Sequence, residues 1–227
     1  MIDFLLSSGY WALLLTVAAY QVGLWVRKKT GSPFLHPILV AVAIIIPFLL
    51  ITKLPNEHYQ EGMNSISWLL TPCTVCLGIS LYTQLNKLKG HILAILAGIL
   101  GGSITSMVLV WGLCLLFGLD ETMTVTLLPK SVTTAMAIPL VESGGGIVAL
   151  TTAAVVITGI LGSVIGSALC KLFKLRNPIA QGVAFGTASH VVGTTKAAEL
   201  SELTGAVSSL SLVIAGIITA IAFSFIL

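Results

Sequence analysis

Residues 128–146 read LPKSVTTAMAIPLVESGGG, a stretch with a lysine, a glutamate, two prolines, several hydroxyl side chains and three closing glycines. The rest of the 227-residue chain is very apolar, because 56% of all residues are hydrophobic and only 8% are charged. Soluble domains contain about 25% charged residues. The composition therefore predicts an all-α, polytopic membrane protein, in which a polar segment of membrane length requires an explanation.

Six windows are long and apolar enough for a transmembrane helix, which needs about 20 residues. They cover residues 10–26, 34–52, 66–82, 91–119, 147–170 and 206–227. Two further windows, 123–142 and 178–200, are too polar for ordinary lipid-facing helices. We predict a single transmembrane domain over residues 1–227, with about six full spans and two interrupted or re-entrant segments.

Basic residues in short loops favour the cytoplasmic side of a membrane. The basic triplet 27–29 follows the first window, so we predict a multi-pass protein of the cell (inner) membrane with its N-terminus outside. If residues 123–142 dip in from outside and return, eight basic loop residues are cytoplasmic and Lys53 alone is external. A full crossing would instead place the basic cluster 171–176 outside. We therefore predict a dip.

The second polar window, 178–200, starts at the cytoplasm and is predicted to be a re-entrant hairpin or a broken span. Irregular backbone at membrane depth requires surrounding protein or a watery cavity. Two such segments from opposite sides predict a cavity near the midplane. A weak internal repeat agrees with this, because LCLLFGL at Leu113 resembles LCKLFKL at Leu169, and PCTVC at 72–76 resembles PKSVT at 129–133. A chance match in leucine- and glycine-rich sequence is the alternative.

The first polar segment has the side chains of a carboxylate site: Lys130 is a cation, and Ser131, Thr133 and Thr134 are hydroxyl donors beside it. A lysine at the membrane centre is unfavourable by about 2.5–3.5 kcal/mol on insertion scales, so it needs a cavity, a partner or the interface. Snorkelling of Lys130 to the outer surface is the alternative. Each hydroxyl taken singly could bond only its own helix.

Glu142 is followed by Ser143 and three glycines, a sequence typical of a tight turn. We expect this glutamate to pair with Lys130 or to accept a coupling proton; a solvated loop carboxylate is the alternative. Thr74, in the third window, would face the same cavity if the repeat is real.

The second segment, GTASHVVGTTKAAE from residue 186, adds a histidine to the same chemistry. His190 titrates near neutral pH and is a natural proton carrier. Ser189 and Thr194 flank it as candidate substrate contacts. A histidine satisfied by packing is the alternative for His190.

Other function classes lack their motifs. The four cysteines fall in apolar windows, and Cys73 and Cys76 have no second pair at zinc spacing. No metal cluster, P-loop, dinucleotide fingerprint or catalytic triad spacing is present. The basic residues are spread over loops, so nucleic acid is not an expected partner. We predict neither an enzyme nor a cofactor.

The sequence resembles the LrgB/CidB family over nearly its whole length. The resemblance rests on PKSVTT (129–134), Glu142 with GGI (145–147), GTASHVVGTTKAAEL (186–200) and TGAVSSLSLVIAGIITA (204–220). TPCTVCLGISLY is similar to a further family segment. The chain departs from residues common in the family at Ser80, Ala135, Val141 and Ala215.

The resemblance implies competing functions. One is a holin-like or antiholin-like factor that modulates murein hydrolase export and cell lysis. Another is transport of small carboxylates such as pyruvate or glycolate, as in the related plastidal glycolate/glycerate translocator. A third is a scaffold for a small LrgA/CidA-like partner. The polar segments favour a secondary transporter of short monocarboxylates, coupled to a proton by His190 or Glu142. A dimer is expected by analogy with helix-paired transporters of this size.

Overall fold

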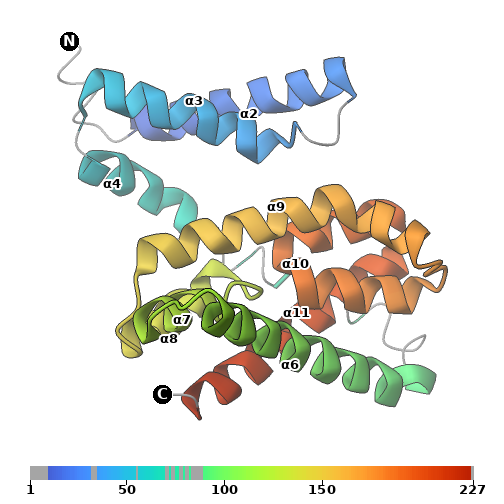
Figure 1. Cartoon of the computed structure of the whole chain (residues 1–227). Coiled ribbons are helices and arrows are strands. Elements are labelled where there is room, and N and C mark those ends of the chain that lie inside the picture. Colours follow the sequence, from blue (N-terminus) through green and yellow to red (C-terminus); the bar gives the residue numbers. More distant parts are fainter. Residues whose placement is uncertain are drawn as a thin grey trace. The chain divides into compact units, whose positions relative to one another are not determined.

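The computed structural model describes residues 10–31, 35–54, 56–69, 72, 75, 76, 79, 82 and 89–225. Every regular element in this part of the chain is helical (Figure 1), as the predicted all-α class requires. The chain divides into two compact units, Met1–Cys76 and Leu77–Leu227. A single membrane domain over the whole chain stays a prediction.

The first unit contains α2 (Tyr10–Thr30), α3 (Pro37–Thr52) and α4 (Asn56–Ser67), and α2 packs against both other helices. Gly23 allows α2 and α3 to approach, because a Cβ there would lie 2.5 Å from the Pro37 carbonyl oxygen. The hydroxyls of Thr16 and Tyr59, 2.7 Å apart, join α2 to α4. Lys53, which was predicted to be external, lies between the end of α3 and the start of α4.

The second unit is built on three long helices, α6 (Ile92–Leu116), α9 (Val148–Leu172) and α11 (Glu202–Ser224). A 3-10 turn, η1 (Lys89–His91), leads into α6. Two short helices, α7 (Glu121–Leu127) and α8 (Thr134–Ser143), connect α6 to α9, and α10 (Pro178–Leu200) connects α9 to α11. Figure 1 shows α7 and α8 at the end of the unit where α6 stops and α9 starts.

Three helices of this unit, α7, α10 and α11, start with a polar side-chain cap. The Asp120 carboxylate accepts a hydrogen bond from Met123 N (2.9 Å) before α7, and the Asn177 side chain accepts one from Ile179 N (2.8 Å) before α10. Ser201 caps α11 in the same way. These caps satisfy amide groups that have no partner in the first turn of a helix.

The two 25-residue helices α6 and α9 also end alike. The residue after each helix C-cap, Gly118 or Lys174, has left-handed backbone (φ 63° and 54°). The next amide donates to the carbonyl of the last cysteine of its helix, Cys114 or Cys170, at 2.9 and 2.8 Å. This is a Schellman cap, and it falls on the two similar sequences LCLLFGL and LCKLFKL.

Three described helices, α6, α9 and α11, are long and apolar enough to cross a membrane. The predicted window 34–52 becomes α3, an apolar helix of only 16 residues. The window 10–26 becomes α2, which does not belong to this set, and eight of the 17 residues of the window 66–82 lie outside the described residues. The core of the second unit forms where α6 meets α11, with Ile95, Ile99, Val207 and Ala215 packed together.

Candidate functional site

The first interrupted segment folds as two short helices separated by the non-helical residues 128–133. Its two ends lie close together. Thr126 accepts a hydrogen bond from Ile147 N on its hydroxyl (2.9 Å) and one from the Thr151 hydroxyl on its carbonyl (2.8 Å). Gly145, with φ 73°, makes the turn into α9. The glycines predicted to form a turn do so at the exit of the segment, and the break itself is at 128–133.

This break reaches the middle of the neighbouring long helices. The Ser131 hydroxyl lies 2.9 Å from the Ser106 hydroxyl, near the centre of α6. Val132 packs on Val155, two turns inside α9. The chain therefore enters the unit along α7, turns beside the centres of α6 and α9, and returns along α8.

The second interrupted segment, α10, is broken at His190, whose backbone is non-helical (φ 40°, ψ −136°). A Cβ on Gly193 would lie 2.8 Å from the Phe185 carbonyl oxygen. These residues are eight positions apart, which is about 12 Å along a straight helix. The two halves of α10 therefore fold back on each other, and His190 is at the tip.

A row of glycines on α9 receives this tip. A Cβ on Gly159 would overlap the His190 ring, one on Gly162 the Ser189 side chain, and one on Gly166 the Phe185 ring. Two further pairs of glycines, four residues apart on α6 and on α10, also allow helices to approach closely. Gly98 and Gly102 of α6 face Val183 and Thr187 of α10, and Gly182 and Gly186 of α10 face α11.

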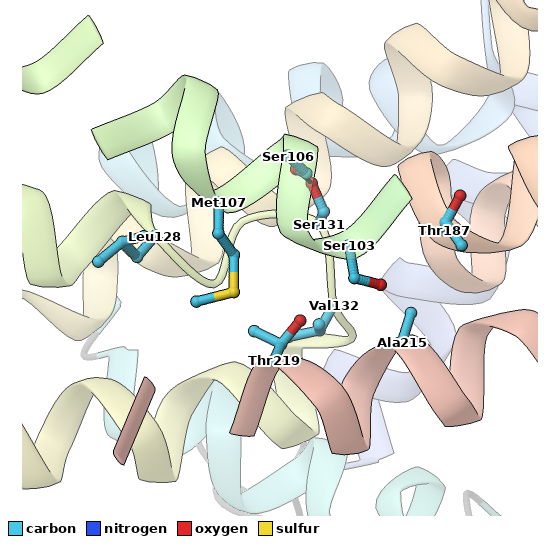
Figure 2. Close-up of a pocket in the computed structure, with 9 residues that line it drawn as sticks. All are labelled: Ser103, Ser106, Met107, Leu128, Ser131, Val132, Thr187, Ala215 and Thr219. Carbon is cyan, nitrogen blue, oxygen red and sulfur yellow. Dashed lines mark hydrogen bonds between the residues drawn. The ribbon is translucent and has the colours of Figure 1, made fainter. Parts of the chain in front are cut away.

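A small cavity of about 10 Å³ lies beside the first break, between α6, α10 and α11, and apolar side chains form part of its wall. Hydroxyl groups from three elements and the first break line it: Ser103, Ser106, Ser131, Thr187 and Thr219. Figure 2 shows Ser106 and Ser131 side by side, with Ser103 and Thr219 directed toward the same space. The Ser103 hydroxyl is buried and has no hydrogen-bond partner among the described residues. The volume corresponds to about one water molecule.

Lys130 lies beside this cavity and lines a larger pocket of about 580 Å³, together with Ser189 of the second segment. Its ammonium donates to the Ser131 hydroxyl at 3.3 Å. It forms no ion pair with any described residue within 4.0 Å. The side chain is partly buried. The structure thus brings together three of the residues predicted from sequence: Lys130, Ser131 and Ser189.

His190 is buried and its Nε2 lies 2.9 Å from the Val155 carbonyl oxygen. A carbonyl only accepts, so Nε2 carries a hydrogen and Nδ1 is the remaining basic nitrogen. The preceding residue, Ser189, lines the same pocket as Lys130. The Thr194 hydroxyl donates to the His190 carbonyl (2.9 Å) and bonds the Ser208 hydroxyl (2.8 Å). Thr194 therefore fastens the break to α11.

The remaining predicted residues lie elsewhere. Thr133 and Thr134 start α8 and line neither of these two cavities. Glu142 is exposed near the end of α8 and forms no ion pair with Lys130, because α8 separates the two residues along the chain. Thr74 lies outside the described residues. Contacts of these residues with a substrate or proton stay predictions.

Sequence reasoning missed Ser103, Ser106, Ser208 and Thr219 as members of this region. Ser103 and Ser106 are three residues apart on one face of α6, which is the available signal. Hydroxyls are common in membrane helices, where they often bond the preceding turn, so that spacing alone is not specific. Within the described residues there is no group of three histidine, cysteine or acidic side chains that could hold a metal ion.

Comparison with known proteins gives a consistent result. The sequence model of the LrgB-like family matches residues 16–227. An antiholin-like protein LrgB of Bacillus mycoides (strain KBAB4) is 35% identical, with 94% of each chain covered. Proteins of the same name from Bacillus cereus (strain B4264) and Bacillus anthracis (strain CDC 684 / NRRL 3495) are 34% identical, again over 94% of each chain. No solved structure matches. The chain therefore belongs to the LrgB-like family.

Proposed function

We propose that this protein binds a small monocarboxylate anion where its two interrupted segments meet, and carries it across the cell membrane. The observation that carries the proposal is Lys130, a partly buried cation that has a hydroxyl beside it and, among the described residues, no carboxylate within 4.0 Å. A lysine held at membrane depth without a counter-ion is unfavourable by a few kcal/mol. An anionic ligand supplies the missing partner.

The breaks supply further positive potential. α8 starts at Thr133, which makes no side-chain cap, and the second half of α10 starts after His190. The first amides of a helix lack internal partners and carry the positive end of its dipole. In many transporters such half-helix starts point at the anionic group of the substrate. Ser131 accepts a hydrogen bond from Lys130 and Ser189 lines the same pocket as Lys130, so both are proposed contacts, with Thr133, Thr134, Thr194 and Thr74 as further ones.

The proposed topology follows from the same segments. We propose a structural repeat, in which each copy consists of one long helix and one folded-back segment. The first copy is α6 with α7 and α8, and the second copy is α9 with α10. Since each copy would cross the membrane once, the second would be inverted relative to the first, an arrangement common in secondary transporters. The equal lengths and equal caps of α6 and α9 support this repeat. The N-terminus is then outside.

Proton coupling is proposed for His190, because it is at the tip of the second segment and follows Ser189, which lines the same pocket as Lys130. Its Nδ1 is free to accept a proton while Nε2 donates to Val155. Glu142 is the second candidate, and its exposed position at the exit of the first segment would suit proton uptake from the outer surface.

The names of the relatives favour a second candidate, an antiholin-like factor that modulates murein hydrolase export and lysis. A scaffold for an LrgA/CidA-like membrane protein is a third. Neither role requires an unpaired lysine beside a hydroxyl-lined cavity. We propose that the transporter is a dimer and that it has the same LrgA/CidA-like membrane protein as its partner.

The test is uptake of labelled pyruvate, glycolate and lactate into proteoliposomes, with and without the LrgA-like partner. Lys130→Met is compared with Lys196→Met, whose lysine is already paired with Glu199 at 2.7 Å. We expect saturable uptake that falls about ten- to hundredfold in Lys130→Met, the effect of losing a charged hydrogen bond, and less than twofold in Lys196→Met. Equal uptake by both variants, or release of unrelated dyes, would support the antiholin-like function instead.

A further inference from the structure

The larger pocket beside Lys130 is much bigger than a three-carbon acid needs. Its volume of about 580 Å³ falls within the range of about 300–1,000 Å³ that is typical of sites for drug-sized ligands. It lies between α9 and the first half of α10. All of its lining residues belong to the second unit.

The pocket is long and has one polar end. Along α9 it extends from Thr158 to Cys170 and beyond, to Phe173. Thr158 and Cys170 are twelve residues apart, or about 18 Å along the helix axis. Lys130 lies at the Thr158 end, because the neighbouring Val132 packs on Val155 of α9. The cation is therefore at the inner end of the pocket, near the centre of α9.

The wall beyond this end is apolar. Leu161, Ile165 and Leu169 follow each other one turn apart on α9 and line the pocket, with Phe185 opposite on α10. Such a wall has no hydrogen-bond partners for the keto or hydroxyl groups of a short polar acid. It suits an aliphatic chain whose charged end is held at the inner end.

We propose that the preferred ligands are amphipathic monocarboxylates, with the carboxylate at Lys130 and Ser189 and a saturated tail along Leu161, Ile165 and Leu169. The inference rests on the proposed carboxylate site and names its substrate class. Each methylene removed from water contributes about a fourfold gain in affinity. Affinity therefore rises with chain length until the tail fills the pocket.

The experiment measures dissociation constants for straight-chain acids from acetate to octanoate, using the full-length protein in nanodiscs. Protein-free nanodiscs give the baseline for partition into lipid. We expect binding to tighten about threefold to fourfold per added methylene. The Ile165→Trp variant, which fills the pocket, removes this dependence on length.

The matched control is Ile157→Trp. Ile157 is on the same helix and is exposed, at 55% compared with 40% for Ile165, but it does not line the pocket. This variant keeps the dependence on length. Equal affinity for all chain lengths, or the same dependence in both variants, would overturn the inference and leave the proposed function standing. If no acid binds in a Lys130-dependent manner, the proposed function itself fails.

Discussion

The two interrupted segments differ in the length of their breaks and in how far the polar groups at the break are bonded within the protein. The first is broken over six residues, 128–133, and presents an unpaired ammonium and a shared hydroxyl to the cavities. The second is broken at the single residue His190, whose ring, backbone carbonyl and neighbouring threonine are all engaged by α9, α10 and α11. Under the proposed function, the first break supplies the cation Lys130, and the second is a tightly packed tip that places Ser189 in the same pocket.

The largest expected effect concerns the sides of the membrane from which the two interrupted segments enter it. Ser143 follows the first segment and Arg176 precedes the second, with α9 between them, a helix of 25 residues that is about 37 Å long. Single cysteines at these positions, in a chain without its native cysteines, should label from opposite sides of the membrane with an impermeant reagent. We expect Ser143 to be accessible from outside and Arg176 from the cytoplasm. The reverse result would mean that residues 123–142 cross fully.

The next prediction tests whether the stability of the protein depends on packing of the α10 tip against the row of glycines on α9. Gly162→Leu places atoms where the Ser189 side chain lies, and overpacking of this kind destabilises by about 1–3 kcal/mol. Gly112→Leu on α6 is the control, since a Cβ there has no neighbour within 4 Å. Thermal unfolding of both variants in detergent measures the difference. Equal melting temperatures would show that the tip is loosely packed.

A smaller effect comes from the backbone at His190. Both His190→Ala and His190→Gly lose the hydrogen bond to Val155, but only alanine keeps a Cβ at φ 40°. Left-handed backbone at a non-glycine residue is unfavourable by about 1 kcal/mol or more. We therefore expect the glycine variant to be the more stable one by about 1 kcal/mol, which is the reverse of the usual order in helices. A more stable alanine variant would show that the break relaxes when the ring is removed.

The smallest effect is expected at Glu142. This side chain is exposed near the end of α8 and forms no ion pair with Lys130. Glu142→Gln should therefore change the affinity for carboxylate by less than twofold. Its effect on accumulation driven by a pH gradient, measured in proteoliposomes beside His190→Gly, decides between the two proposed proton carriers.

Much of the helix pattern was predictable from sequence. The windows 91–119, 147–170 and 206–227 differ from α6, α9 and α11 by a few residues at each end, because long apolar runs bounded by caps and basic residues have few alternatives. The polar window 178–200 has the bounds of α10. The short helix α4 was missed, since its polar residues resemble a loop. Glycines and prolines indicated that the segments are interrupted, but not at which residue.

The sequence by itself determined that this chain is an all-α membrane protein with two polar segments, because hydropathy and helix caps are local properties. Only the tertiary structure decided which polar groups meet. Ser106 reaches Ser131, Ser189 packs into Gly162 and Lys130 lies beside a pocket formed by α9 and α10. The same structure separates Glu142 from Lys130. These distances depend on how closely helices approach, and that is set by glycines on one helix and side chains on another, a pairing that no single segment specifies.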